Sequence, residues 1–152
     1  MNAPDRQATM KKIADIAKLA GIRGEVDGKG RFAAGFNLSG QRTQVVYVLP
    51  SMQLPAGTVV NIYSPCRVVK GGFLSGMSKE QALDLLKANE KIPFARYSVI
   101  EGEDGQLLVM AGMDALLETL DAAEFGTYLW AVATYADAYE AKHEDRKATD
   151  RF

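Results

Sequence analysis

Apolar residues at the start of the chain recur with a helical period. Between residues 6 and 20, apolar residues recur three or four positions apart, opposite a face rich in lysine: Met10, Ile13, Ile16, Ala17 and Ala20. This spacing predicts an amphipathic helix with one apolar stripe. Gly21 comes next and is expected to end the helix, because glycine adopts the left-handed backbone conformation without strain.

From residue 22 to about 69 the apolar period changes to two, which predicts β-strands. A short strand is expected over 22–26, followed by a turn over 27–30. The next strand, over 31–38, alternates most clearly. Its predicted apolar face consists of Phe32, Ala34, Phe36 and Leu38.

Two further strands are expected over 41–49 and 58–63. Residues 50–57 contain two prolines and are predicted to form the connection between them. Pro65 has no N–H group to donate to a neighbouring strand. An edge strand, a bulge or a strand end is therefore predicted there.

A second helix is marked by a capping box, in which Ser78 and Gln81 bond each other's backbone N–H. Two strands are predicted after it, over 93–100 and 106–111, joined by an acidic hairpin over 101–105. The predicted apolar face of the helix consists of Ala82, Leu83, Leu85 and Leu86.

The last helix is predicted to begin near Asp121, which with Glu124 repeats the capping pattern, and to end at about residue 142. Residues 113–120 are expected to form a short helical turn before it. Its apolar stripe consists of Phe125, Leu129, Val132, Ala136 and Tyr139. The helix carries more aromatic side chains on and around this stripe than one packing interface can bury. Four of them are therefore candidate partner-binding residues: Tyr128, Trp130, Tyr135 and Tyr139.

These elements predict an α+β fold, an antiparallel sheet with helices packed on it, in the order α-β-β-β(-β)-α-β-β-α. A chain of 152 residues with 47% hydrophobic and 24% charged residues is expected to form one domain, 1–152. The expected folded core is 6–140. Residues 141–152 form a charged tail that is expected to fray.

Charge and cysteine content restrict the classes of partner. The chain has 18 basic and 19 acidic residues and a net charge of -1, which does not favour nucleic acid or a membrane as partner. The only cysteine, Cys66, forms no disulfide within one chain. There is no apolar run of membrane-spanning length and no signal-peptide pattern at the N-terminus, so a cytoplasmic location is predicted.

Side chains suited to catalysis are few and scattered. The single histidine, His143, lies at the end of the last helix, where a surface position is expected. Cys66 beside Arg67 is expected to be a half-buried strand residue, although a nearby cation favours thiolate. Glu101, Glu103 and Asp104 share one hairpin and are expected to be solvated. No catalytic residue, cofactor site or metal site is predicted, and the chain is not expected to be an enzyme.

The glycine and aromatic motifs of the chain are also expected to have structural roles and not binding roles. Gly28, Gly30 and Ala33 match the spacing of a dinucleotide fingerprint, but a strand follows them where that motif requires a helix. A similar run from Gly24 to Lys29 is one residue short of a P-loop. Phe32 and Phe36 resemble the aromatic residues of an RNA-binding strand, but they are expected to lie in the core.

The order of elements resembles the fold of class I type III secretion chaperones, such as the Tir chaperone, and of bacterial YbjN-like domains. The likeness in residues extends from Asn89 through Pro93, Phe94, Tyr97, Asp104-Gly105, Leu107, Leu108, Leu116 and Leu120 to Leu129, Val132, Ala133 and Ala136-Asp137. The resemblance implies a homodimer with a helix-backed sheet and apolar grooves that hold an extended segment of another protein.

The leading hypothesis is therefore a cytoplasmic, homodimeric module that binds a partner polypeptide and performs no chemistry. An exposed sheet edge accepts an added strand, and apolar pockets beside it select its side chains. One alternative is a small-molecule or nucleotide-sensing regulatory domain with a pocket between sheet and helices. Another is an enzyme that uses Cys66 or the acidic hairpin.

Overall fold

The structure, a computed structural model, describes residues 3–69, 77–102 and 105–143. A short 3-10 turn over Ser39–Gln41 connects the second and third strands of this part of the chain. The helices and strands follow in the order α1 (Ala3–Leu19), β1 (Gly24–Val26), β2 (Phe32–Asn37), β3 (Thr43–Leu54), β4 (Gly57–Val69), α2 (Lys79–Asn89), β5 (Arg96–Glu101), β6 (Leu107–Leu116) and α3 (Ala122–His143). This confirms the predicted α+β class and the order with four strands before the second helix.

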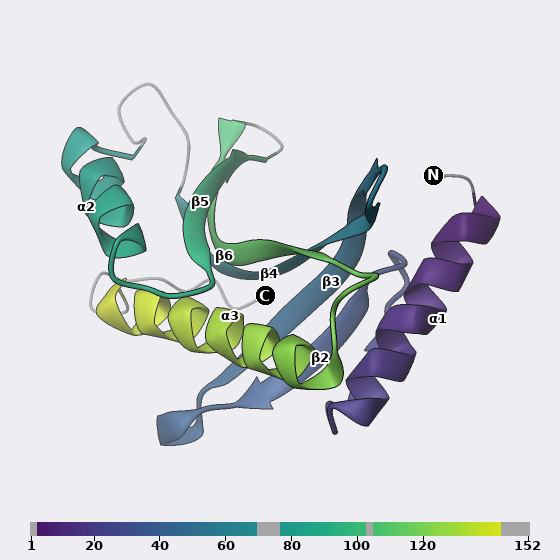
Figure 1. Ribbon diagram of the computed structural model, residues 1–152. Helices are drawn as coiled ribbons and strands as arrows, with labels where there is room; N and C mark the ends of the chain where they lie inside the picture. Colours follow the sequence, from purple (N-terminus) through teal and green to yellow (C-terminus); the bar gives the residue numbers. More distant parts are fainter. Residues whose placement is uncertain (1–2, 70–76, 103–104, 144–152) are drawn as a thin grey trace.

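All the described strands belong to one antiparallel sheet in the order β1-β2-β3-β4-β6-β5. The edges of the sheet are therefore β1 and β5. Figure 1 shows α3 running along one side of the sheet, with α1 and α2 near its opposite ends. α1 packs against β1, β2 and β3, and α2 packs against β5.

The predicted helix boundaries follow from local hydrogen bonds. Gly21 has φ +70°, which is the left-handed conformation expected after α1. Before α2, Gln81 N donates to Ser78 Oγ at 3.2 Å and Ser78 N donates to Gln81 Oε1 at 2.8 Å. Before α3, Glu124 N donates to Asp121 Oδ1 at 2.8 Å. Each capping side chain replaces a backbone partner that the first turn of a helix lacks.

The hydrophobic core lies between one face of the sheet and the helices. Full burial of a large apolar side chain contributes roughly 1.5–3 kcal/mol, so this layer is the main source of stability. The predicted core faces of α1, β2 and α3 are confirmed for most of their residues. The exceptions are only partly buried: Ile16, Ala20, Leu38 and Tyr139. The core includes Met10, Ile13, Ala17, Phe32, Ala34, Phe36, Val46, Val48, Val60, Ile62, Leu85, Val109, Ala111, Phe125, Leu129, Val132, Ala133 and Ala136.

The predicted connection over 50–57 is wrong, because β3 continues through Pro50 to Leu54. Residues that bond β2 alternate along β3 with residues that bond β4. Val48 belongs to the first set and pairs with Phe32, the first residue of β2. Pro50 faces the same side two residues later, beyond the end of β2, so its missing N–H removes no bond of the sheet.

The predicted helical turn over 113–120 is also wrong, because β6 extends to Leu116. Its last residues pair with β4, where Met113 lies opposite Ile62 and Leu116 opposite Val59. Pairing with a distant strand therefore overrides the local pattern. Of the three alternatives for Pro65, the bulge is confirmed, since the register shifts between Pro65 and Arg67 inside the sheet.

The apolar face predicted for α2 is only partly correct. Leu85 is buried, but Leu83 is 42% exposed and Leu86 is 66% exposed. α2 packs at the end of the sheet against β5, so only one side of the helix meets the core. These two leucines are left on the surface.

Arg42, just before β3, connects the sheet to the end of α3. Its Nε donates to Asp137 Oδ1 and its Nη2 donates to Asp137 O at 3.3 Å, while Glu140 lies 3.7 Å from Nη2. Both side chains of the Arg42–Asp137 pair are mostly buried. No helix in the described part of the chain combines the length and apolar character needed to span a bilayer.

Candidate functional site

The edge strand β1 presents backbone groups to solvent. Asp27 N donates to Arg31 O at 2.8 Å, which makes these two residues a hydrogen-bonded pair between the β1 and β2 sides of the hairpin. Bonded and non-bonded pairs alternate in an antiparallel ladder, so Glu25 bonds Ala33 across β2. The N–H and C=O groups of Gly24 and Val26 therefore point away from the sheet.

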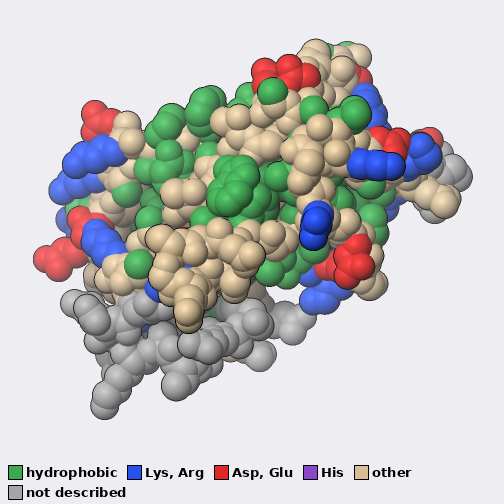
Figure 2. All heavy atoms as spheres, turned by 90° about the horizontal axis from the view of Figure 1, so that it is seen from below, with side chains coloured by type: hydrophobic (Ala, Val, Ile, Leu, Met, Phe, Trp, Pro, Cys, Tyr) green, Lys and Arg blue, Asp and Glu red, His purple; other side chains and the backbone are tan. Residues whose placement is uncertain are grey.

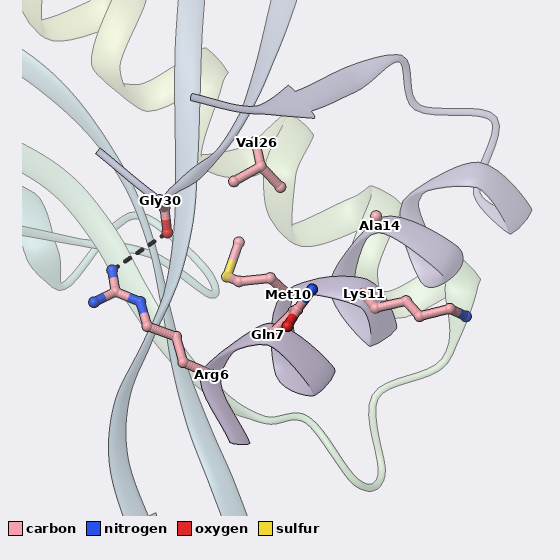
Figure 3. A pocket seen from close by; sticks show the side chains of 7 residues that line it. All are labelled: Arg6, Gln7, Met10, Lys11, Ala14, Val26 and Gly30. Carbon is pink, nitrogen blue, oxygen red and sulfur yellow. Dashed lines mark hydrogen bonds between the residues drawn. The ribbon is translucent and has the colours of Figure 1, made fainter. Parts of the chain in front are cut away.

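Two hollows lie between this edge and α1. The first, of about 450 Å³, has an apolar floor of Met10, Ala14 and Val26, with Arg6 and Lys11 beside it. Figure 3 shows Met10 and Val26 reaching toward each other across it, while Arg6 bends toward Gly30. Arg6 Nη2 donates to Gly30 O at 3.3 Å, which holds this end of α1 to the turn after β1.

The second hollow, of about 530 Å³, continues the first, because Ala14 lines both. Its floor includes Ala17, Ile22 and Phe32, and its cations are Lys18 and Arg23. The first hollow touches the N-terminal half of α1 and the end of β1, whereas the second touches the C-terminal half and the start of β1. The two form one groove along α1, which runs antiparallel to β1. We call it the α1–β1 groove.

Gly24 lines the second hollow at a position where no larger residue fits. A Cβ atom at this position would lie 2.5 Å from Phe32 Cζ and 2.6 Å from the carbonyl oxygen of Ala33. These separations are too short for real atoms, so the backbone would have to move to make room for a Cβ atom. The groove was not predicted from the sequence, although two lysines seven residues apart on α1, Lys11 and Lys18, were a visible signal.

The opposite edge, β5, is partly closed by Asn89. Gly102 N donates to Gln106 O, so by the same alternation the backbone groups of Tyr97, Val99 and Glu101 point away from β6. Asn89 bonds Tyr97 as a neighbouring strand would. Tyr97 N donates to Asn89 Oδ1 at 2.7 Å, and Asn89 Nδ2 donates to Tyr97 O at 3.1 Å.

Exposed apolar side chains gather around the β5 edge. Leu83 and Leu86 of α2, Phe94, Val99 and Ile100 are between 38% and 66% exposed. We call these five residues the α2–β5 surface. Strand alternation directs Val99 and Ile100 to opposite faces of β5, so apolar side chains are exposed on both sides of this edge. Exposed apolar residues gathered at one edge of a folded domain can mark an interface.

The four predicted partner-binding aromatics do not form one patch. Trp130 is 46% exposed, and its ring packs edge-on against Phe36 at 4.8 Å between centroids. Tyr128, Tyr135 and Tyr139 are partly buried against the core on the other side of α3. Figure 2 shows hydrophobic side chains across the middle of the face seen from below in Figure 1, with most charges at its rim. Partner binding by these four residues stays a prediction.

The other aromatic contacts on that side of α3 are structural. Tyr97 Oη donates to Tyr135 O at 2.8 Å, and burial raises the pKa of Tyr97 to about 12. Tyr139 stacks on His143 with ring centroids 4.2 Å apart, and His143 Nδ1 lies 2.7 Å from Tyr139 O. His143 thus lies at the end of α3, as predicted, and is partly covered by an aromatic ring.

Cys66 is more buried than the half-buried position predicted, with 6% exposure. Burial raises the pKa of its thiol to about 12, so the thiol stays protonated at neutral pH and is a poor nucleophile. Among residues 3–69, 77–102 and 105–143, no three His, Cys, Asp or Glu side chains are placed to hold a metal ion. Glu103 and Asp104 of the acidic hairpin lie outside the described residues.

The glycine and aromatic motifs take structural positions. The run containing Gly28 and Gly30 leads into β2, not into a helix, as predicted. Phe32 and Phe36 are 1% and 4% exposed, which confirms their place in the core. Comparison of the chain with models of protein families and with curated proteins returns no match.

Proposed function

We propose that this domain is a non-enzymatic, chaperone-like module that binds an extended segment of a partner polypeptide in the α1–β1 groove. The observation that carries the proposal is an outward-facing backbone at Gly24 and Val26 beside an apolar groove. A bound strand would pair with β1 and extend the sheet by one strand. Its alternate side chains would enter the two hollows.

The length of β1 restricts what pairs with it. The strand has three residues, and only Gly24 and Val26 direct N–H and C=O groups outward. Backbone pairing therefore holds a few residues of the partner, and the side chains in the hollows supply the remaining affinity. The element order that resembles secretion chaperones supports the same assignment.

Val26 offers a direct test of strand addition. Its outward N–H makes no bond to β2, so Val26→Pro removes a donor for the partner and leaves the β1–β2 ladder intact. Val26→Ala serves as the matched control, because it shortens the side chain in the hollow and keeps the N–H. We expect proteins captured by cross-linking from native cytoplasm to be lost with Val26→Pro and retained, at reduced yield, with Val26→Ala. Equal capture by the wild type and Val26→Pro would refute strand addition.

The second part of the proposal is a homodimer through the α2–β5 surface. The outward backbone groups of Val99 and Glu101 are available to the β5 strand of a second copy, related by a two-fold axis. Leu83 and Leu86 would pack across the same axis, which removes the most exposed leucines of α2 from water.

Light scattering tests the dimer. We expect the wild type to have twice the monomer mass at micromolar concentration, and Leu86→Lys to shift it to the monomer. Leu19→Lys is the matched control, because Leu19 is 79% exposed at the other end of the molecule. A wild-type monomer at micromolar concentration would contradict the proposal.

The proposed location is the cytoplasm. Its support is Cys66, the only cysteine, which is buried in the core and makes no disulfide within the chain.

A small-molecule regulator is the second candidate, because the hollows have volumes typical of ligand sites. A panel of metabolites and nucleotides is tested for shifts in the melting temperature of the wild type. A shift that Val26→Ala reduces would favour this candidate, and a panel without any shift would count against it.

A further inference from the structure

The residues that line the α1–β1 groove differ in charge from the chain as a whole. The two hollows are lined by four basic residues, Arg6, Lys11, Lys18 and Arg23, and by no acidic residue. The full chain has nearly equal numbers, with 18 basic and 19 acidic residues. The groove is therefore a positive strip on an almost neutral protein.

The acidic residues of the β1 hairpin, Glu25 and Asp27, are directed away from the groove or are engaged. Glu25 lies between Gly24 and Val26, which line the hollows, so strand alternation places its side chain on the opposite face. Asp27 forms an ion pair of 2.7 Å with Arg31. Hydrogen bonds from the Arg31 backbone N–H and from its side chain lower the pKa of Asp27, so it stays ionised in this pair.

Three of the four cations have no acidic partner within the described part of the chain. Lys11 pairs with Asp15 at 2.8 Å, but Arg6, Lys18 and Arg23 form no ion pair there. Arg6 and Lys18 mark the two ends of the groove. Twelve residues of helix separate them, which corresponds to about 18 Å along the axis.

We propose that the α1–β1 groove selects an acidic segment, with carboxylates at its two ends and small apolar side chains between them. This inference rests on the proposed function, since it assumes strand addition at β1. Alternate residues of a strand lie about 6.8 Å apart on one face, so four such positions span about 20 Å. The first and fourth positions meet Arg6 and Lys18, and the second and third enter the hollows.

A polypeptide is favoured over a nucleic acid by the same residues. The floor of the groove is apolar and suits aliphatic side chains; it includes Met10, Ala14, Ala17, Ile22, Val26 and Phe32. Of these, Phe32 is 1% exposed, so its ring is not available to stack on a base. The outward N–H and C=O groups of β1 match a peptide backbone.

The test uses synthetic peptides of seven residues, the length that spans the groove. The acidic probe has glutamate at its ends, valine at its third and fifth positions and threonine elsewhere. A neutral probe replaces glutamate by glutamine, and a basic probe replaces it by lysine. Binding to ¹⁵N-labelled full chain is measured from the amide shifts of Gly24 and Val26. We expect the acidic probe to bind about tenfold more tightly than the neutral one, because it forms two ion pairs at the surface of the groove.

Charge reversal identifies the residues responsible. In Arg6→Glu/Lys18→Glu, the basic probe should bind more tightly than the acidic one. Lys12→Glu/Lys87→Glu makes the same change in net charge outside the groove and should keep the wild-type order. High salt should reduce the advantage of the acidic probe.

A fourth probe separates this inference from the proposed function. It is the acidic peptide with N-methyl groups on the backbone amides that would face β1. If the neutral probe binds as tightly as the acidic one and N-methylation abolishes binding, strand addition stands and the acidic preference is overturned. If N-methylation changes nothing, or no probe shifts Gly24 and Val26 at millimolar concentration, both are overturned. A single-stranded oligonucleotide that displaces the acidic probe and binds more tightly would overturn the choice of a polypeptide.

Discussion

Replacing Asn89 by alanine removes the side chain that takes the place of a neighbouring strand at Tyr97. Two hydrogen bonds are lost, of 2.7 and 3.1 Å, both to the backbone of a partly buried residue. Each contributes about 0.5–1.5 kcal/mol net, so Asn89→Ala should lower the free energy of unfolding by about 2 kcal/mol. With a urea m-value of about 2 kcal/mol per molar, the unfolding midpoint should fall by about 1 M.

Amide exchange locates the effect. The N–H of Tyr97 should exchange at least tenfold faster in Asn89→Ala, whereas the N–H of Ser98, which bonds β6, should keep its protection. Asn61→Ala is the matched control. Its bond to Asp114 Oδ1 is exposed and its bond to Met113 O is long, at 3.4 Å, so their loss should cost clearly less than that of the two Asn89 bonds. A loss of under 0.5 kcal/mol in Asn89→Ala, or unchanged exchange at Tyr97, would refute the role assigned to Asn89.

Three further changes test the core and its connections. Arg42→Ala should lower the free energy of unfolding by about 2 kcal/mol, because it removes charged hydrogen bonds to α3; an equal loss in Arg42→Lys would show that the geometry of these bonds matters more than the charge. Gly24→Ala should lower the melting temperature because its Cβ collides with Phe32, whereas Gly28→Ala, with open space around it, should not; equal melting temperatures would contradict the tight approach. Stability should fall as pH rises above 9.0, the ordinary pKa of a thiol, because the unfolded chain releases the Cys66 proton there and the folded chain holds it to about pH 12. Melting curves between pH 8 and 10 should show a weaker pH dependence in Cys66→Ala, and an unchanged slope would exclude this contribution.

The helix caps and the core faces were predictable because they depend on residues near each other in the chain. Ser78 bonds Gln81, and Asp121 bonds Glu124, across three residues. This spacing in the sequence is enough to place the two side chains within hydrogen-bond distance of each other's backbone. The alternation of β2 was also sufficient, since one face of that strand lies entirely on the core.

The candidate site was not predictable in the same way. The predicted partner-binding residues were chosen because the last helix carries more aromatic side chains than one apolar stripe needs. Most of these aromatic side chains pack around the core, where Tyr128 contacts Phe94 and Tyr139 contacts Tyr97. The α1–β1 groove combines residues from two elements whose sequence patterns are unremarkable alone. The groove exists because of the distance between α1 and the sheet edge. The spacing of residues within α1 or within β1 does not predict that distance.

The sequence by itself determined the α+β class, the helix caps and most of the core faces of α1, β2 and α3, because these follow from periodicity and local capping. Only the tertiary structure decided that β3 continues through Pro50, that β6 extends past Met113, and that Asn89 closes the β5 edge at Tyr97 while β1 forms the other, open edge. The physical reason is that strand pairing satisfies backbone groups between distant segments. Where a strand ends, and which of its backbone groups face solvent, depends on the neighbour it pairs with.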